Sequence, residues 1–318
     1  MTAGRALVDQ VREELNQPVS AGAQRLVDAI CRRHGDAVQA VMFYGSCMRD
    51  EASERDGILD FYVFVDRYRD FYDSRLAAFA NALLPPNVFF MQIGAGDDAL
   101  RTKYSIVSLA AFTHGTSPRY FHQYFWARFS QPCRLVYARS AGAGDAVAQA
   151  LAGAVRTFVL RALPLAPERF RIEDLWITQF DQSYRGELRS ERRDATRQLY
   201  ESNREWYERV TPAALQEIGV AYTTESIGGE EWYTAQLSPM SRKLALPLWR
   251  LRRIVGRIFS VLRLAKGAVT FEGAIDYALW KIQRHSGAEI DVNWREQRHP
   301  LFALVGIFLK LFRQGAIR

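Results

Sequence analysis

The chain has 318 residues, 48% of them hydrophobic, which is enough for one large or two ordinary domains with a substantial core. Its 42 Lys and Arg residues outnumber its 35 Asp and Glu residues, so the formal net charge is +7 at pH 7. The three cysteines lack Cys-x-x-Cys spacing, which argues against a structural zinc site and fits a reducing compartment. The N-terminus lacks the apolar core of a secretory signal, and no segment has the roughly 20 uninterrupted apolar residues of a membrane span.

The hydrophobic pattern predicts a helical segment over residues 5–35, then strands at Val38–Tyr44 and Ile58–Val65. An amphipathic helix over Asp70–Leu84 is expected to end at the two prolines that follow it. Beyond this point the pattern predicts strands at Val88–Ile93, Lys103–Ser108 and Cys133–Tyr137, and helices at Phe112–Phe129, Asp145–Leu163, Ile172–Tyr184 and Ala195–Val210.

The positive charge is concentrated at the C-terminal end. Residues 241–318 hold 15 basic and 5 acidic residues, a net charge of +10, and the rest of the chain holds 27 basic and 30 acidic residues. Such a region predicts contact with a polyanion, either a membrane surface or a nucleic acid. Its basic residues alternate with bulky aliphatic residues rather than with the aromatic residues that stack bases, so we expect no nucleic-acid partner.

Two neighbouring segments carry the pattern of a nucleotidyltransferase active site. An apolar strand leads into Gly45-Ser46, and after a polar excursion a second apolar strand carries Asp60. Glycine lets the backbone approach a triphosphate, and backbone N–H groups and the Ser46 hydroxyl can then bond phosphate oxygens. The Asp60 carboxylate can bind Mg²⁺. Many such enzymes have a second carboxylate two residues further on, where Tyr62 stands here, so a second metal ligand must come from elsewhere.

Other candidate residues have competing interpretations. Glu187 could supply the second carboxylate, or it could form an ion pair with Arg185 or Arg189. Lys103 begins a predicted strand after a glycine-rich loop and could pair with a phosphate, or it could be a surface lysine.

Several blocks in this order resemble the mitochondrial-type phosphatidate cytidylyltransferases, also known as mitochondrial translocator assembly and maintenance proteins. The blocks are Phe43–Ser46, Ile58–Asp66, Lys103–Ser108, Trp126–Pro132, Ser183–Arg189, and Lys266–Thr270 with Ala274–Lys281. The resemblance implies an enzyme that makes CDP-diacylglycerol and pyrophosphate from CTP and phosphatidic acid with Mg²⁺. It also implies a peripheral protein at the cytoplasmic face of an anionic membrane.

The resemblance also implies roles for particular residues. Gly45, Ser46 and Tyr44 would bind CTP, Asp60 and Glu187 would be catalytic and bind the metal, and Lys103 would be catalytic. Arg185 and Arg189 would bind the anionic lipid headgroup. The sequence departs from the family at Cys47–Asp50, at Glu187, where the family has Asp, in lacking a targeting leader, and in the extension Asn293–Arg318.

The predicted class is therefore α+β. We expect a nucleotidyltransferase-fold domain with a mixed sheet over residues 1–140, a mostly helical domain over 141–240, and a basic amphipathic membrane-associating region over 241–318. Within that last region Leu248–Leu264 and Leu301–Phe312 are the membrane candidates, and a core or dimer-interface helix is the alternative. Two other functions compete: transfer of a nucleotide to a soluble sugar, antibiotic or protein, and a catalytically decayed binder of membrane or nucleic acid.

Overall fold

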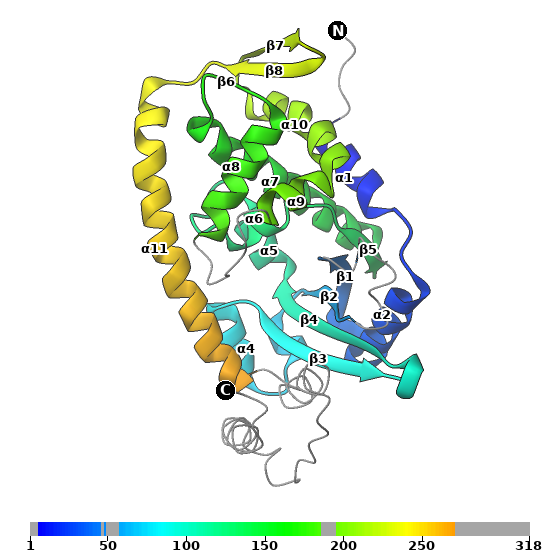
Figure 1. The fold of residues 1–318 in the computed structure, drawn as a ribbon. Helices are drawn as coiled ribbons and strands as arrows, with labels where there is room; N and C mark the ends of the chain where they lie inside the picture. The colour runs from blue at the N-terminus through cyan, green and yellow to red at the C-terminus, as the bar shows by residue number, and fades with distance from the viewer. Residues whose placement is uncertain (1–5, 46–47, 49–56, 186–194, 271–318) are drawn as a thin grey trace, which may run out of the picture.

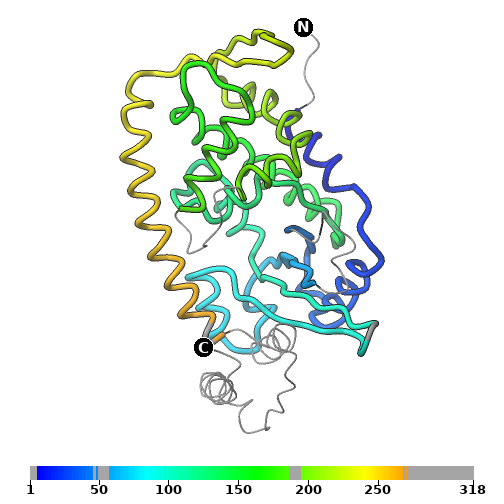
Figure 2. Tube along the Cα trace, viewed as in Figure 1, coloured from blue at the N-terminus to red at the C-terminus, as the bar shows by residue number. Residues whose placement is uncertain are grey.

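This computed structural model describes residues 6–45, 48, 57–185 and 195–270 of the chain. The strands of a mixed sheet lie at one end of the molecule and a group of helices lies towards the other (Figure 1). One long helix, α11 (Pro239–Thr270), runs along the side and links the two ends, as the tube trace also shows (Figure 2). The predicted α+β class is confirmed.

The main sheet has five strands in the order β3-β4-β2-β1-β5. The central pair, β2 and β4, runs parallel, and the other three pairings are antiparallel, which makes the sheet mixed, as the sequence predicts. In strand order the residues are Asn87–Ile93 (β3), Leu100–Ser108 (β4), Leu59–Val65 (β2), Val38–Tyr44 (β1) and Arg134–Ala138 (β5).

Both faces of this sheet are covered, which explains why its central strands are apolar almost without interruption. Helix α2 (Ala21–His34) packs on one face through residues such as Val27 and Ile30. Helices α5 (Leu109–Thr116), α6 (Tyr124–Arg128) and α7 (Ala141–Ala162) lie over the other face. The side chains of Asp60, Tyr62 and Phe64 alternate with the α2-facing ones, so they point towards these helices.

Helix α7 is the centre of the helical part. It contacts α5, α6 and three further helices, and most of its residues are buried. In the described part of the chain, only Ala141–Leu165 is apolar and long enough to span a membrane, and 67% of its apolar window is buried inside the protein. That burial identifies α7 as a core helix. The three further helices are α1 (Leu7–Leu15), α8 (Ile172–Tyr184) and α10 (Arg204–Ile218).

The core around α7 joins residues on both sides of position 140, because α1 from the N-terminal segment packs on α7 and α10. The limits 1–140, 141–240 and 241–318 therefore stay predictions. A three-stranded sheet that the sequence pattern did not predict lies beside the helices. Its strands are β6 (Arg169–Phe170), β7 (Tyr222–Ile227) and β8 (Glu230–Ala235), and both glycines of the β7–β8 turn have positive φ.

Four helices predicted as continuous are broken, so these predictions were wrong in extent. The 5–35 segment divides into α1 and α2 around Pro18, and the 112–129 segment divides into α5 and α6 around Pro118, since proline stops the preceding helix. Ser74 caps a new helix by accepting a bond from the Ala77 N–H. The broken pairs elsewhere are α3 (Tyr68–Phe71) with α4 (Arg75–Leu83), and α9 (Ala195–Glu201) with α10.

Helix α11 turns several of its charged residues inward. Its inner seam consists of residues spaced alternately by three and four, which keeps them in line along a helix. Arg252 is 3% exposed and donates to the Phe121 carbonyl, Arg263 donates to the Pro85 carbonyl, and Lys266 donates to the Leu84 and Pro86 carbonyls. The complete inner seam is Ala245, Trp249, Arg252, Gly256, Phe259, Arg263, Lys266 and Thr270.

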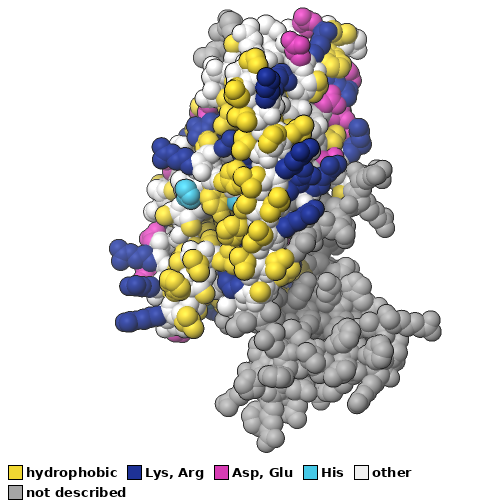
Figure 3. All heavy atoms as spheres, turned by 90° about the vertical axis from the view of Figure 1, so that its left-hand side faces the viewer, with side chains coloured by type: hydrophobic (Ala, Val, Ile, Leu, Met, Phe, Trp, Pro, Cys, Tyr) yellow, Lys and Arg dark blue, Asp and Glu magenta, His cyan; other side chains and the backbone are white. Residues whose placement is uncertain are grey.

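The opposite side of α11 is aliphatic and faces solvent. We call it the outer stripe, and its members are between 37% and 58% exposed: Leu244, Leu248, Leu251, Ile254, Ile258, Val261 and Leu262. Next to its C-terminal half, α4 exposes Leu76, Phe79 and Leu83, which we call the α4 patch. Figure 3 shows hydrophobic side chains gathered along this face, with Lys and Arg side chains beside them.

Candidate active site

One row of paired residues crosses four strands of the main sheet and contains most of the described residues that the sequence singled out. Tyr44 on β1 pairs with Asp60 on β2, Asp60 pairs with Lys103 on β4, and Lys103 pairs with Phe90 on β3. Directly paired residues share a face of a sheet, so all four side chains lie on the face towards the helices. The sequence predicted roles for three of these four residues, and Phe90 was missed because strand register cannot be read from one strand.

Asp60 and Lys103 form an ion pair at the centre of this row. The Lys103 Nζ lies 3.7 Å from the Asp60 Oδ1, and the two side chains are 31% and 32% exposed, respectively. Partial exposure leaves both charges within reach of a ligand from solvent. Phe90 beside them is 7% exposed, so the pair lies between solvent and the apolar surface of the sheet.

The turn after β1 brings the backbone against Asp60. Gly45 has φ +97, a value that favours glycine because other residues rarely adopt it. A Cβ atom on Gly45 would stand 3.5 Å from the Asp60 Oδ2, so a larger residue would fill the space beside the carboxylate. The role that the sequence predicted for Gly45, close approach of the backbone to a ligand, is compatible with this geometry.

The described residues around Asp60 and Gly45 are compatible with a magnesium ion bound to a triphosphate. The Asp60 carboxylate supplies a hard oxygen ligand, and Gly45 keeps the space next to it clear. Among the described residues, no group of three or more His, Cys, Asp or Glu side chains is arranged to hold a metal ion. Glu187, the predicted second carboxylate, lies outside the described residues, as do Ser46 and Arg189.

The structure places Arg185 at the C-terminal end of α8, where its side chain is exposed. The neighbouring Tyr184 stacks on Phe180 at a ring distance of 6.1 Å and so belongs to the helical core. The predicted role of Arg185 in headgroup binding stays a prediction.

An aromatic cluster that the sequence did not predict extends from the row towards α6. The Tyr44 ring lies 5.1 Å from the Tyr62 ring, and the Tyr62 hydroxyl lies 3.2 Å from the Tyr124 hydroxyl. Tyr62 is fully buried, and burial raises its pKa well above the usual value, with the neighbouring Tyr124 and Tyr44 adding to the shift. Tyr62 is thus a neutral hydrogen-bonding residue at the position where many nucleotidyltransferases have a second carboxylate.

Two guanidinium groups lie over the ring of Tyr124. The Arg128 Cζ is 4.5 Å from the ring centre and the Arg263 Cζ is 3.8 Å from it, which is cation–π distance. Arg128 belongs to one of the sequence blocks quoted above, although no role was assigned to it. Arg263 comes from α11, and only the packing of that helix against α6 brings it here.

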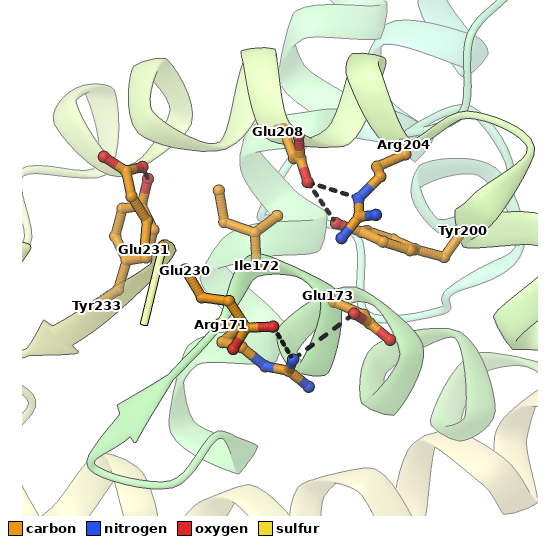
Figure 4. Close-up of a pocket in the computed structure, with 10 residues that line it drawn as sticks. Arg171, Ile172, Glu173, Tyr200, Arg204, Glu208, Glu230, Glu231 and Tyr233 are labelled. Carbon is orange, nitrogen blue, oxygen red and sulfur yellow. Dashed lines mark hydrogen bonds and ion pairs between the residues drawn. The ribbon is translucent and has the colours of Figure 1, made fainter. Parts of the chain in front are cut away.

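The helical part of the molecule contains a separate polar pocket of about 290 Å³, shown in Figure 4. Arg171 pairs with Glu230 at 3.0 Å, and Arg204 pairs with Glu208 at 2.8 Å, so basic and acidic groups already neutralise one another there. Its lining comes from α8, α9, α10 and the β7–β8 hairpin and includes no residue of the row around Asp60. The pocket is therefore not the predicted site.

No family model and no curated protein matches this sequence. Among solved structures, the chain is similar to a nucleotidyltransferase-like protein from Exiguobacterium sibiricum 255-15. The two share 11% sequence identity with a TM-score of 0.28, over 93% of each chain. At those values the likeness supports no conclusion about activity, and the α+β class follows from the strands and helices themselves.

Proposed function

We propose that this chain is a Mg²⁺-dependent nucleotidyltransferase. The observation that carries the proposal is the Asp60–Lys103 ion pair on the two parallel central strands, directly beside the positive-φ turn at Gly45. A carboxylate for a metal, a cation for a phosphate and a backbone without a side chain are the groups that triphosphate binding needs. The resemblance in sequence blocks favours CTP as the nucleotide.

In the proposed reaction, a phosphate oxygen of the acceptor attacks the α-phosphorus of CTP. The bond from that phosphorus to the oxygen bridging to the β-phosphate breaks, and pyrophosphate leaves with the bonding electrons. Because the attacking phosphate is already anionic, no side chain has to remove a proton. Lys103 would hold phosphate oxygens as a point charge, and Asp60 would hold Mg²⁺, which neutralises charge on the triphosphate when bound. Positioning and charge neutralisation then supply the rate.

The surface of α11 favours a lipid acceptor, phosphatidic acid, over a soluble one. The outer stripe and the α4 patch together expose ten large aliphatic or aromatic side chains on one face. Apolar surface in contact with water is unfavourable by roughly 25 cal/mol per Å², so a face of this kind is stabilised by an apolar environment. An interfacial position at the cytoplasmic face of a membrane would provide that environment.

The charge of α11 favours an anionic membrane. The helix contains eight basic residues and no acidic residue among its 32 positions. Lys243, Arg250 and Arg257 are exposed on it. Each basic residue near an anionic surface contributes about 1 kcal/mol to binding. The segment Leu301–Phe312, also predicted to associate with membranes, lies outside the described residues.

The proposal is tested by incubating the purified protein with each labelled nucleoside triphosphate, Mg²⁺ and phosphatidic acid vesicles, followed by lipid extraction. We expect label from CTP in the lipid phase, with release of pyrophosphate. Phosphatidylcholine vesicles and common sugars serve as the comparison acceptors. If pyrophosphate appears only with a soluble acceptor, the lipid part of the proposal is wrong and the soluble-acceptor alternative stands.

The site assignment is tested by Asp60→Asn, which keeps the shape of the side chain and removes its charge. We expect turnover to fall at least ~100-fold, as when a preorganised electrostatic group is removed. The control is Asp66→Asn, since Asp66 follows the end of the same strand, is exposed, and has no role in the row. Turnover like that of the wild type in Asp60→Asn, with an unchanged circular dichroism spectrum, would contradict the assignment.

A further inference from the structure

Two guanidinium groups, those of Arg128 and Arg263, lie over the ring of Tyr124 on the same face of the sheet as Asp60, and we call these three side chains the positive region. Arg128 reaches the ring from α6 itself and Arg263 reaches it from α11, at 4.5 Å and 3.8 Å from the ring centre. All three side chains are partly exposed, so the cluster borders solvent. Arginine stacked on an aromatic ring in this way keeps its planar fork of donors in a fixed orientation, which suits recognition of a phosphate.

Arg263 has donor capacity that the described protein does not use. Its Nε donates to the Pro85 carbonyl at 3.1 Å, while its Nη1 is buried and has no hydrogen-bond acceptor in the described part of the chain. No carboxylate among the described residues lies within ion-pair distance of Arg263. A buried charged donor without an acceptor is unfavourable, and a bound anion would remove that penalty.

The charge of Arg263 affects the pKa values of two neighbouring side chains, His122 and Lys266. Burial, with a further contribution from Arg263, lowers the pKa of His122 to about 3 and the pKa of Lys266 to about 8. Burial is the larger cause of both shifts, and the guanidinium of Arg263 adds to them by disfavouring a second positive charge nearby. An incoming phosphate would be attracted by the charge of Arg263.

A chain of contacts connects this region to the row around Asp60. The Tyr124 hydroxyl meets the Tyr62 hydroxyl at 3.2 Å, the Tyr62 ring meets the Tyr44 ring at 5.1 Å, and Tyr44 pairs with Asp60 across the strands. On the outer side, the residues flanking Arg263 on α11 are Leu262 and Leu264, which are 48% and 65% exposed. The positive region is thus connected to the predicted nucleotide site through Tyr62 and Tyr44, and Arg263 within it is flanked along α11 by exposed leucines.

We propose that Arg128 and Arg263 bind the phosphate monoester of an amphiphilic acceptor, whose acyl chains follow the outer stripe of α11. The inference rests on the proposed function and assigns the acceptor phosphate to α6 and α11 rather than to Arg185. Both arginines are positioning residues: they hold the attacking phosphate beside the α-phosphorus without taking part in bond making. A soluble phosphate compound has no acyl chains that could contact the outer stripe.

The kinetic test is Arg263→Gln, measured with CTP and phosphatidic acid vesicles. We expect KM for phosphatidic acid to rise ~10- to 100-fold, as for loss of hydrogen bonds to a charged group, with KM for CTP unchanged. Arg263→Lys should fall in between, because it keeps the charge and loses the planar fork. The matched control is Arg209→Gln, since Arg209 also lies over an aromatic ring, Trp206 at 5.4 Å, but on α10. If Arg263→Gln does not fold, Arg263→Lys and Arg128→Gln are used for the test.

A binding test without nucleotide separates this inference from the proposed function. Phosphatidylcholine vesicles containing either phosphatidic acid or phosphatidylserine at equal mole fraction are floated with each variant. We expect Arg263→Gln to lose the preference for phosphatidic acid while keeping the weaker binding to phosphatidylserine. Equal loss on both vesicles, or unchanged kinetics in Arg263→Gln, would overturn the inference. Arginine-dependent binding of phosphatidic acid with no nucleotide transfer would support it while contradicting the proposed function.

Discussion

Helices α7 and α11 contrast in where they place their charged and apolar residues. α7 contains the apolar stretch long enough to cross a membrane, yet it lies in the core among α1, α5, α8 and α10. α11 carries eight basic residues, yet it presents aliphatic side chains to solvent along its length. The apolar content of a helix therefore does not identify its environment. What identifies it is the side to which the charged residues turn.

The physical reason lies in the partners available to each helix. Around α7, aromatic rings such as Trp176, at 4.4 Å from the Phe158 ring, fill most of the space. The polar side chains of Thr157 and Arg161 on this helix donate to the Thr116 and Pro118 carbonyls. Under α11, the protein surface presents backbone carbonyls at Leu84, Pro86 and Phe121, and these accept hydrogen bonds from Lys266 and Arg252. Leu84 caps the C-terminal end of α4, where the helix dipole favours a cation.

We expect the greatest change in the free energy of unfolding when a buried phenylalanine, Phe158, is compared with an exposed one, Phe79. Phe158→Ala on α7 removes a fully buried ring and should lower the free energy of unfolding by about 3–5 kcal/mol. Phe79→Ala in the α4 patch removes a ring that is 64% exposed and should change it by less than about 0.5 kcal/mol. Both values come from urea denaturation monitored by circular dichroism. A comparable loss in Phe79→Ala would mean that the α4 patch is covered by protein.

The next effect concerns the inner side of α11, where Phe259 packs on His122 at a ring distance of 5.3 Å. Burial, helped by Arg263, lowers the pKa of His122 to about 3, below its ordinary value of 6.5. The unfolded chain therefore takes up a proton below pH 6.5 that the folded chain refuses, so the folded state loses stability as the pH falls from 6.5 towards 3. Between pH 7 and pH 5 this loss should be about 2 kcal/mol.

His122→Asn removes the titrating ring and offers an oxygen in place of the Nδ1 that accepts from the Tyr124 N–H. From pH 7 to pH 5, we expect the unfolding free energy of the wild type to fall by about 2 kcal/mol relative to that of this variant. A difference that does not change with pH would show that α11 does not keep His122 neutral.

The smallest expected effect tests the outer stripe itself. Replacing Ile254 and Ile258, which are 58% and 54% exposed, by Gln should weaken binding to phosphatidic acid vesicles by about 1–2 kcal/mol, or about tenfold. Their thermal unfolding should be unchanged. Ile227→Gln is the control, because Ile227 is 45% exposed but lies on β7, away from α11. Unchanged vesicle binding together with a change in oligomeric state would identify the stripe as a protein interface.

The sequence by itself determined the strands that carry the site and the residue types within them. β1, β2 and β3 begin and end within one residue of their predicted limits, because β-branched and aromatic runs bounded by glycine, proline and polar residues have few alternatives. Gly45, Asp60 and Lys103 could be singled out as candidates for a related reason, since the chemistry of these residue types is readable in the local sequence. Three of the four broken helices are interrupted where proline or a serine cap falls within a continuous hydrophobic pattern.

Tertiary structure alone decided which of these residues meet. Register across three pairs of strands puts Tyr44, Asp60, Lys103 and Phe90 in one row, and no local pattern encodes register between strands far apart in the chain. The side of α11 that faces the protein could not be predicted either. Basic residues occur on both sides of the helix, and composition does not show which side meets hydrogen-bond acceptors. The carbonyls at the C-terminal end of α4 accept hydrogen bonds from Arg263 and Lys266, and the Phe121 carbonyl before α6 accepts one from Arg252. The same packing leaves the aliphatic residues facing out.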